Sequence, residues 1–169
     1  MNIPTANLGL RAIARQAGVS HGAPRRYFPT HAALLSAVAA RGFADLLACF
    51  SSCVHDTPRV RIERMSTEYV SFAVERPEMF TLMFRHDLLE GSGQNLRQQT
   101  VPIYREWAAL VDRCCPGDTS RALGLWTSVH GIAVLAASRS LELIAPEAKP
   151  RLLVLESVAR HLGSVSIAT

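Results

Sequence analysis

Two arginines and a tyrosine, Arg25, Arg26 and Tyr27, form the most chemically distinctive group in this 169-residue chain. Guanidinium groups donate hydrogen bonds to phosphate oxygens and to guanine edges, and a tyrosine hydroxyl can reach a phosphate. His21 adds a ring that can contact either a base or a phosphate. These residue types, grouped within one short segment, predict a surface that contacts DNA.

The distribution of charge supports this interpretation. Residues 1–44 hold five arginines and no acidic residue, whereas the whole chain carries a net charge of +4. The rest of the chain is therefore almost neutral, with 13 basic and 14 acidic residues. A polyanion is expected to meet the N-terminal quarter, where arginines can replace counterions on phosphates. An ordinary basic surface is the other interpretation that charge alone allows.

The elements around this group read as two short helices joined by a tight turn and followed by a third helix. Gly18 can adopt the positive φ that ends the first helix, and Ser20 is a good N-cap for the second. The second helix, over about 20–28, is polar and carries the arginines. Thr30 is a plausible N-cap for the third helix, which links this predicted DNA-contacting segment to the rest of the chain.

The remaining chain shows apolar residues at helical spacing and almost no strand signal, which predicts an all-α fold. Turn residues at 56–58 and 115–118 separate the periodic segments, and Asp118 can cap the helix that follows it. That helix is apolar on both sides, so we expect the core to cover one face and a second subunit the other. The expected helices are about 31–52, a segment after the 56–58 turn that ends before Pro77, about 78–84, a segment around 104–111, a segment around 119–136, and a closing segment after Pro150 that includes Leu162.

A ligand-binding cavity is a second candidate site. Trp126 and His130 are one helical turn apart and so share a face. Aromatic rings and flexible methionines can enclose an apolar or aromatic molecule, to which His130 would supply one polar contact. The alternative is that these residues are plain core. The candidate ligand-binding set is Tyr69, Phe72, Met79, Met83, Tyr104, Trp107, Trp126 and His130.

Two segments carry a family resemblance. The sequence IARQAGVSHGAPRRYF, followed by PTHAALL, resembles the helix-turn-helix of tetracycline-repressor-type (TetR-type) transcriptional regulators. Far downstream, WTSVHGIAV from Trp126 is similar to the Trp, His-Gly signature of one C-terminal regulatory domain of that family. The resemblance implies a DNA reader over 1–44 and a helical effector-binding and dimerisation body over 45–169.

The resemblance also implies roles for particular residues and partners. The last two long helices would form a homodimer interface, usually a four-helix bundle. An unknown small-molecule effector would bind the body, and a palindromic double-stranded operator would bind the readers. The implied DNA-contacting residues are Ser20, His21, Gly22, Ala23, Arg25, Arg26, Tyr27 and His31.

The N-terminus departs from the family pattern. TetR-type readers have a longer helix before the helix-turn-helix, and the nine residues before Leu10, with Pro4 and Gly9 among them, cannot supply it. The reader is therefore predicted to be N-terminally incomplete, through a misassigned start or a true truncation. The leading hypothesis is a ligand-responsive regulator, a repressor. The alternative is a truncated dimeric ligand-binding or heterodimerising module without effective DNA binding.

Other function classes find little support. There is no glycine-rich phosphate loop, no GxSxG and no HExxH, so we expect no enzyme, no catalytic residue and no cofactor. The four cysteines lack CxxC spacing, which favours reduced thiols over a metal site. No leader pattern or membrane-length apolar run is evident, so a cytoplasmic protein without a membrane partner is expected.

Overall fold

The computed structural model describes residues 15, 18, 26–51, 56–89 and 95–163. These residues form helices and no strand, so the predicted all-α class is confirmed for the described chain. Two short helices, α6 and α9, are additional to those expected. The helices are α3 (His31–Ser51), α4 (Pro58–Glu75), α5 (Pro77–Met83), α6 (His86–Leu89), α7 (Arg97–Cys114), α8 (Thr119–Ala137), α9 (Ser140–Ile144) and α10 (Pro150–Leu162).

Local capping explains where several helices begin. The Thr30 hydroxyl oxygen accepts a hydrogen bond from the Ala33 amide at 3.0 Å, and the Asp118 carboxylate accepts one from the Ser120 amide at 3.2 Å. Two of the three N-caps predicted from the sequence, Thr30 and Asp118, are therefore confirmed. The third, Ser20, lies outside the described residues. Pro58 and Pro150 each occupy the first position of a helix, where the missing N–H has no helical partner.

Gly18 has the backbone conformation that the sequence predicts. Its φ is +67°, and its amide donates a hydrogen bond to the Arg15 carbonyl at 3.2 Å. A positive φ costs glycine little because it has no Cβ. This is the geometry of a chain leaving a helical turn.

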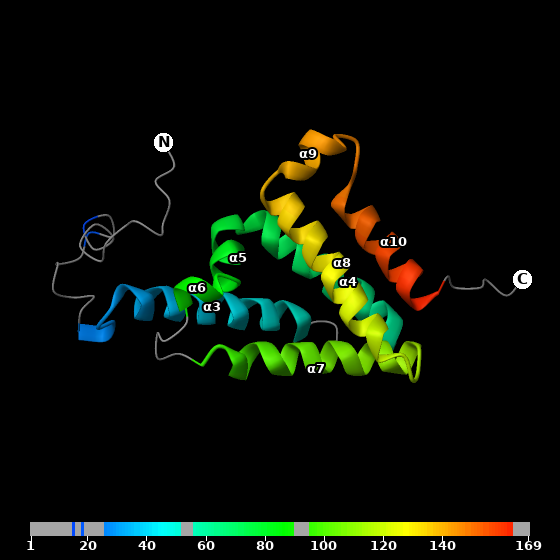
Figure 1. The fold of residues 1–169 in the computed structure, drawn as a ribbon, viewed down its shortest axis with the longest axis horizontal. Helices are drawn as coiled ribbons and strands as arrows, with labels where there is room; N and C mark the ends of the chain where they lie inside the picture. The colour runs from blue at the N-terminus through cyan, green and yellow to red at the C-terminus, as the bar shows by residue number, and fades with distance from the viewer. Residues whose placement is uncertain (1–14, 16–17, 19–25, 52–55, 90–94, 164–169) are drawn as a thin grey trace, which may run out of the picture.

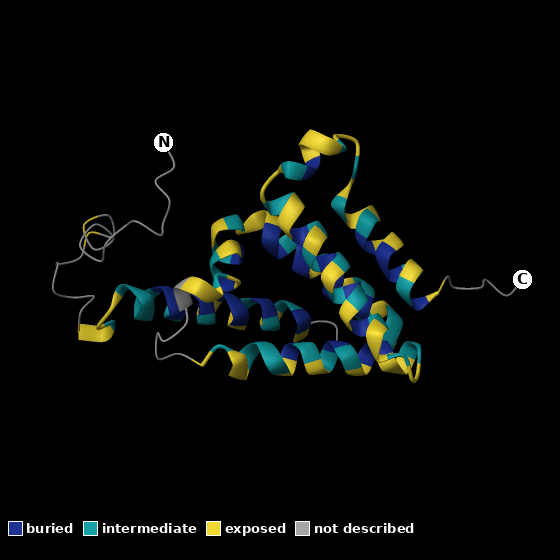
Figure 2. Cartoon of the chain, viewed as in Figure 1, coloured by how far each residue is buried: buried dark blue, intermediate teal, exposed yellow. Residues whose placement is uncertain are grey.

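Helix α4 lies at the centre of the body and packs against α3, α5, α7, α8 and α10. α10 also packs on α8, whereas α3 lies along α5, α6 and α7 (Figure 1). Buried residues line the inward faces of these helices (Figure 2). The largest fully buried side chains include Trp107, Phe80, Leu46, Ile62 and Met65.

Helix α3 joins the N-terminal segment to the body without a break. The predicted domain boundary between residues 44 and 45 lies inside it, and its N-terminal end extends beyond the other helices (Figure 1). Among the described helices, α3 is long and apolar enough to cross a membrane by length and composition alone. A core helix passes the same test, and α3 packs against four other helices.

Candidate functional site

An aromatic cluster lies where α4, α5 and α8 meet. The ring centroid of Tyr69, on α4, is 5.3 Å from that of Trp126 and 6.1 Å from that of His130, both on α8. Phe80, on α5, lies 5.4 Å from Tyr69 and 5.7 Å from His130. The structure thus brings together three of the residues that the sequence predicts as ligand-binding.

One hydrogen bond lies inside this cluster. The Tyr69 hydroxyl is 2.8 Å from His130 Nδ1. Tyr69 is 2% exposed and His130 is half-buried. Burial raises the pKa of Tyr69 and lowers the pKa of His130, because a low-dielectric environment disfavours the charged form of each. The pair is therefore a neutral polar unit within apolar surroundings.

Phe80 and Phe84 belong to the cluster but were not among the predicted ligand residues. The Phe84 ring lies 4.7 Å from His130, 5.1 Å from Phe80 and 6.4 Å from Tyr69. It also lies 5.8 Å from Phe43 of α3. The i, i+4 spacing of the two phenylalanines, which places them on one helix face, was a signal that could have found them.

The other predicted ligand residues lie around the cluster or away from it. Tyr104 and Trp107 of α7 lie 6.0 and 5.5 Å from Trp126, and the Trp107 indole N–H donates to the Ala122 carbonyl at 3.1 Å. Phe72 lies under the Arg76 guanidinium at 5.2 Å. Apart from Tyr104, which lines a hollow of about 360 Å³ between α7 and α8, these residues fill core positions.

The two methionines of the predicted set contact α3. A Cβ built at Gly42 would lie 2.6 Å from the Met83 sulfur and 2.9 Å from the Met79 sulfur. The absence of a side chain at Gly42 therefore lets α5 approach α3 closely. This contact joins the residues beside the aromatic cluster to the helix that leads to the N-terminal segment.

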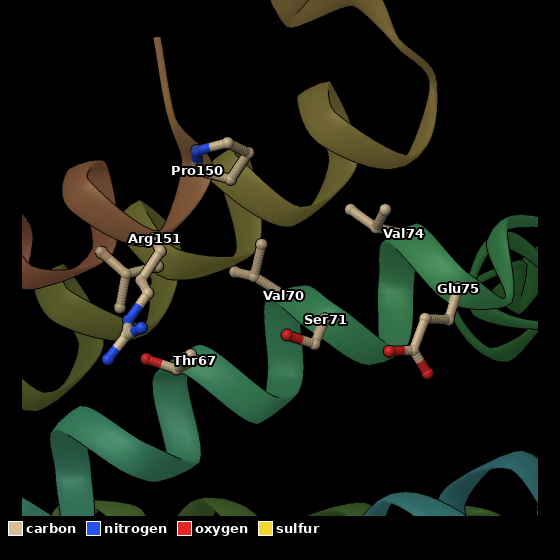
Figure 3. A pocket seen from close by; sticks show the side chains of 8 residues that line it. Thr67, Val70, Ser71, Val74, Glu75, Pro150 and Arg151 are labelled. Atoms are coloured by element: carbon tan, nitrogen blue, oxygen red, sulfur yellow. The ribbon is translucent and has the colours of Figure 1, made fainter.

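A groove that the sequence did not predict runs between α4 and α10 (Figure 3). Its volume is about 230 Å³, its apolar side is formed by Val70, Val74 and Val154, and Arg151 lies at its edge. A second hollow along the same helices shares Thr67 and Arg151 with it. Among the described residues, no group of three or more His, Cys, Asp or Glu side chains could hold a metal ion.

The predicted DNA-contacting residues lie at the N-terminal end of α3 and before it. Ser20, His21, Gly22, Ala23 and Arg25 lie outside the described residues. Arg26 and Tyr27 are helical and exposed, and Tyr27 is 78% exposed.

His31, the first residue of α3, is half-buried. Its Nε2 is buried without a hydrogen-bond partner. The predicted phosphate contact would therefore need the imidazole to rotate or to use Nδ1.

The outer faces of α8 and α10 carry exposed apolar side chains. On α8 the inward face is Ala122, Leu125, Val129 and Ala133, and the exposed large side chains are Leu123, Val134 and Leu135. On α10 they are Leu152 and Leu155. Gly131 of α8 is exposed, and a Cβ there would meet nothing within 4 Å. Gly131 therefore makes no close helix contact within the subunit.

Comparison with known proteins identifies the family. The model of the tetracyclin repressor-like, C-terminal domain matches residues 62–159. The chain belongs to the tetracycline repressor-like family. A solved structure of a protein of unknown function from Rhodococcus sp. RHA1 has a TM-score of 0.75 and 30% sequence identity, over 92% of this chain and 83% of that one. None of the curated proteins matches the chain.

The matched tetracycline repressor-like domain contains the whole aromatic cluster, whereas Phe43, which contacts Phe84, lies before it. It also contains the Trp126, His130 and Gly131 signature, and the structure separates these three residues by environment. Trp126 and His130 belong to the aromatic cluster, whereas Gly131 is exposed on α8. The signature therefore includes one inward pair and one surface position.

Proposed function

We propose that this protein is a ligand-responsive, DNA-binding transcriptional regulator that acts as a repressor and is not an enzyme. The observation that carries the proposal is a tetracycline repressor-like domain joined through one unbroken helix, α3, to a basic segment without acidic residues. Exposed Arg26 and Tyr27 lie at the start of that connection. The segment 20–27 would enter a major groove, and His31 would lie near the DNA backbone.

The reader is proposed to act in pairs. Exposed leucines and valines on α8 and α10 favour association with a second copy through these helices, because burial of apolar surface drives association. Gly131 leaves room for a facing helix to approach α8. A two-fold dimer would present two readers to a palindromic operator.

The effector is proposed to be a small apolar or aromatic molecule held near Tyr69, Trp126 and His130. Support comes from the hydrogen-bonded Tyr69–His130 pair among aromatic side chains, a composition typical of small-molecule sites. Its binding would favour a dimer geometry in which the readers no longer match the operator. Family membership also favours a cytoplasmic protein.

A footprinting experiment tests the proposal. The full chain, incubated with the DNA beside its own gene, is expected to protect two half-sites whose centres are about 34 Å apart or a multiple of that distance. The protein should dissociate from unrelated DNA of equal length at a lower salt concentration than from the DNA beside its gene. Equal affinity for both DNA fragments at every salt concentration would contradict the proposal.

A further inference from the structure

The Tyr69 hydroxyl determines which imidazole nitrogen of His130 carries the hydrogen. A buried hydroxyl needs an acceptor for its proton, and Nδ1 of His130 is the partner that the described residues give it. Tyr69 therefore donates and Nδ1 accepts. In a neutral imidazole the other ring nitrogen then carries the hydrogen, so Nε2–H is a hydrogen-bond donor.

This donor has no acceptor among the described residues. His130 makes its one hydrogen bond through Nδ1, and Nε2 is not among the buried polar atoms that lack a partner. The nitrogen is therefore not sealed inside the core. Burial lowers the pKa of His130 and keeps the ring neutral. The rings of Phe80, Phe84 and Trp126 surround the Tyr69–His130 pair with aromatic surface.

Phe84 covers this pair on the side of α5. Its ring is the nearest to His130, at 4.7 Å, yet 38% of the residue is exposed. Phe84 is the C-cap of α5 and precedes the turn into α6. A partly exposed ring at the end of a seven-residue helix can move at lower cost than a ring packed on every side.

We propose that Phe84 is a lid over a ligand site whose polar anchor is the Nε2–H group of His130. The ligand class is a planar aromatic molecule that carries a carbonyl-type acceptor. The aromatic walls favour such a ring through edge-to-face and offset packing, and the neutral donor selects an acceptor. This inference rests on the proposed function, since the ligand would be the effector.

The lid also contacts the helix that leads to the reader. The Phe84 ring packs edge-on against Phe43 of α3 at 5.8 Å. A ligand that displaces Phe84 removes this contact from α3. Movement of the Phe84 side chain thus opens the ligand site and also changes the packing of α3, which leads to the N-terminal segment.

Two probes of nearly equal shape test the anchor: acetophenone, which has a carbonyl oxygen, and α-methylstyrene, which has a methylene group in its place. Phe84→Ala opens the site, as an apolar cavity that accepts small aromatic molecules. NMR titration of the full-length variant should give acetophenone up to about tenfold tighter binding than α-methylstyrene, the value expected for one added hydrogen bond. The His130 imidazole nitrogen signals should shift with acetophenone only.

Further variants separate the lid from the anchor. The preference for acetophenone should vanish in the double variant Phe84→Ala/His130→Phe. Wild type should keep the preference but bind acetophenone more slowly than Phe84→Ala does. Phe84→Leu replaces Phe84→Ala if the latter does not fold, and Leu143→Ala, at an exposed position of α9, is the control. Equal binding of both probes, binding of neither, or a preference that survives the loss of His130 would overturn the inference. DNA binding measured on the same samples without probe tests the proposed function separately.

Discussion

Tyr69 and His130 are joined by a hydrogen bond within the aromatic cluster, so each side chain fixes the orientation of the other. Replacing Tyr69 by phenylalanine leaves His130 Nδ1 without a partner in a half-buried position. We expect the free energy of unfolding to fall by about 1 to 2 kcal/mol, the usual cost of an unpaired buried polar atom.

Chemical denaturation measures this loss, and Tyr104→Phe is the matched control. Tyr104 is half-buried on α7, and the described structure gives its hydroxyl no hydrogen bond. The control should therefore change the stability by less than about 0.5 kcal/mol. Equal losses in both variants would contradict the role of the hydrogen bond.

The lowered pKa of His130 predicts how the free energy of unfolding depends on pH. Burial lowers the pKa of His130 in the folded state, whereas the unfolded chain has the ordinary value of about 6.5. Between these two values the unfolded state binds a proton that the folded state does not. Stability is therefore expected to fall as the pH drops from about 6.5 towards the folded pKa, and to be independent of this group above about 6.5.

Denaturation of wild type and His130→Asn at several pH values measures this effect. Asparagine retains an acceptor for Tyr69 but does not titrate. Wild type should lose more stability than the variant between about pH 7 and about pH 5. Parallel curves for the two proteins would show that His130 is not the group responsible.

At the scale of elements, the contact between α3 and α5 depends on the absence of a side chain at Gly42. A Cβ there would lie 2.6 Å from the Met83 sulfur. Gly42→Val is therefore expected to lower the free energy of unfolding by about 1 to 3 kcal/mol through overpacking. Ala44→Val, on the exposed side of the same helix, should change it by less than about 0.5 kcal/mol. Thermal or chemical denaturation compares them, and equal effects would refute the close contact.

The helices themselves were largely predictable, because apolar periodicity and capping residues act locally. Thr30, Asp118 and Gly18 could be assigned from residue type and neighbours alone. The two unpredicted helices, α6 and α9, have four and five residues, too few for a periodic pattern. Pairing between distant residues was not predictable either, since the contact of Phe84 with Phe43 depends on how α5 packs against α3.

In the candidate site too, local features could be predicted from the sequence, whereas contacts between distant residues could not. The one-turn spacing of Trp126 and His130 placed them correctly on one face, which meets the cluster. Helical spacing could not say which apolar residues of α8 face inward. Leu123, which helical spacing places on the same side of α8 as Trp126 and His130, is 55% exposed. The Tyr69 partner of His130 lies 61 positions away in the chain, which no local pattern reveals.

At the scale of the whole molecule, dimerisation through α8 and α10 is a separate prediction. Gly131→Arg adds a large charged side chain where the subunit has open space, so the monomer should fold normally. If a second copy covers this face, the variant should be monomeric by light scattering while wild type is dimeric. Ala44→Arg adds the same charge to an exposed position of α3 and should leave the dimer intact. A dimeric Gly131→Arg protein would contradict this interface.

The most direct test of the account is the salt dependence of operator affinity for Arg26→Gln, compared with Arg105→Gln. Both variants remove one exposed arginine, the first before α3 and the second on α7. Fluorescence anisotropy on DNA from beside the gene should show weaker binding for Arg26→Gln. The slope of log affinity against log salt concentration should also fall in magnitude by about one. Arg105→Gln should match wild type. Identical slopes for all three proteins, or binding without sequence preference, would contradict a reader at the N-terminal end of α3.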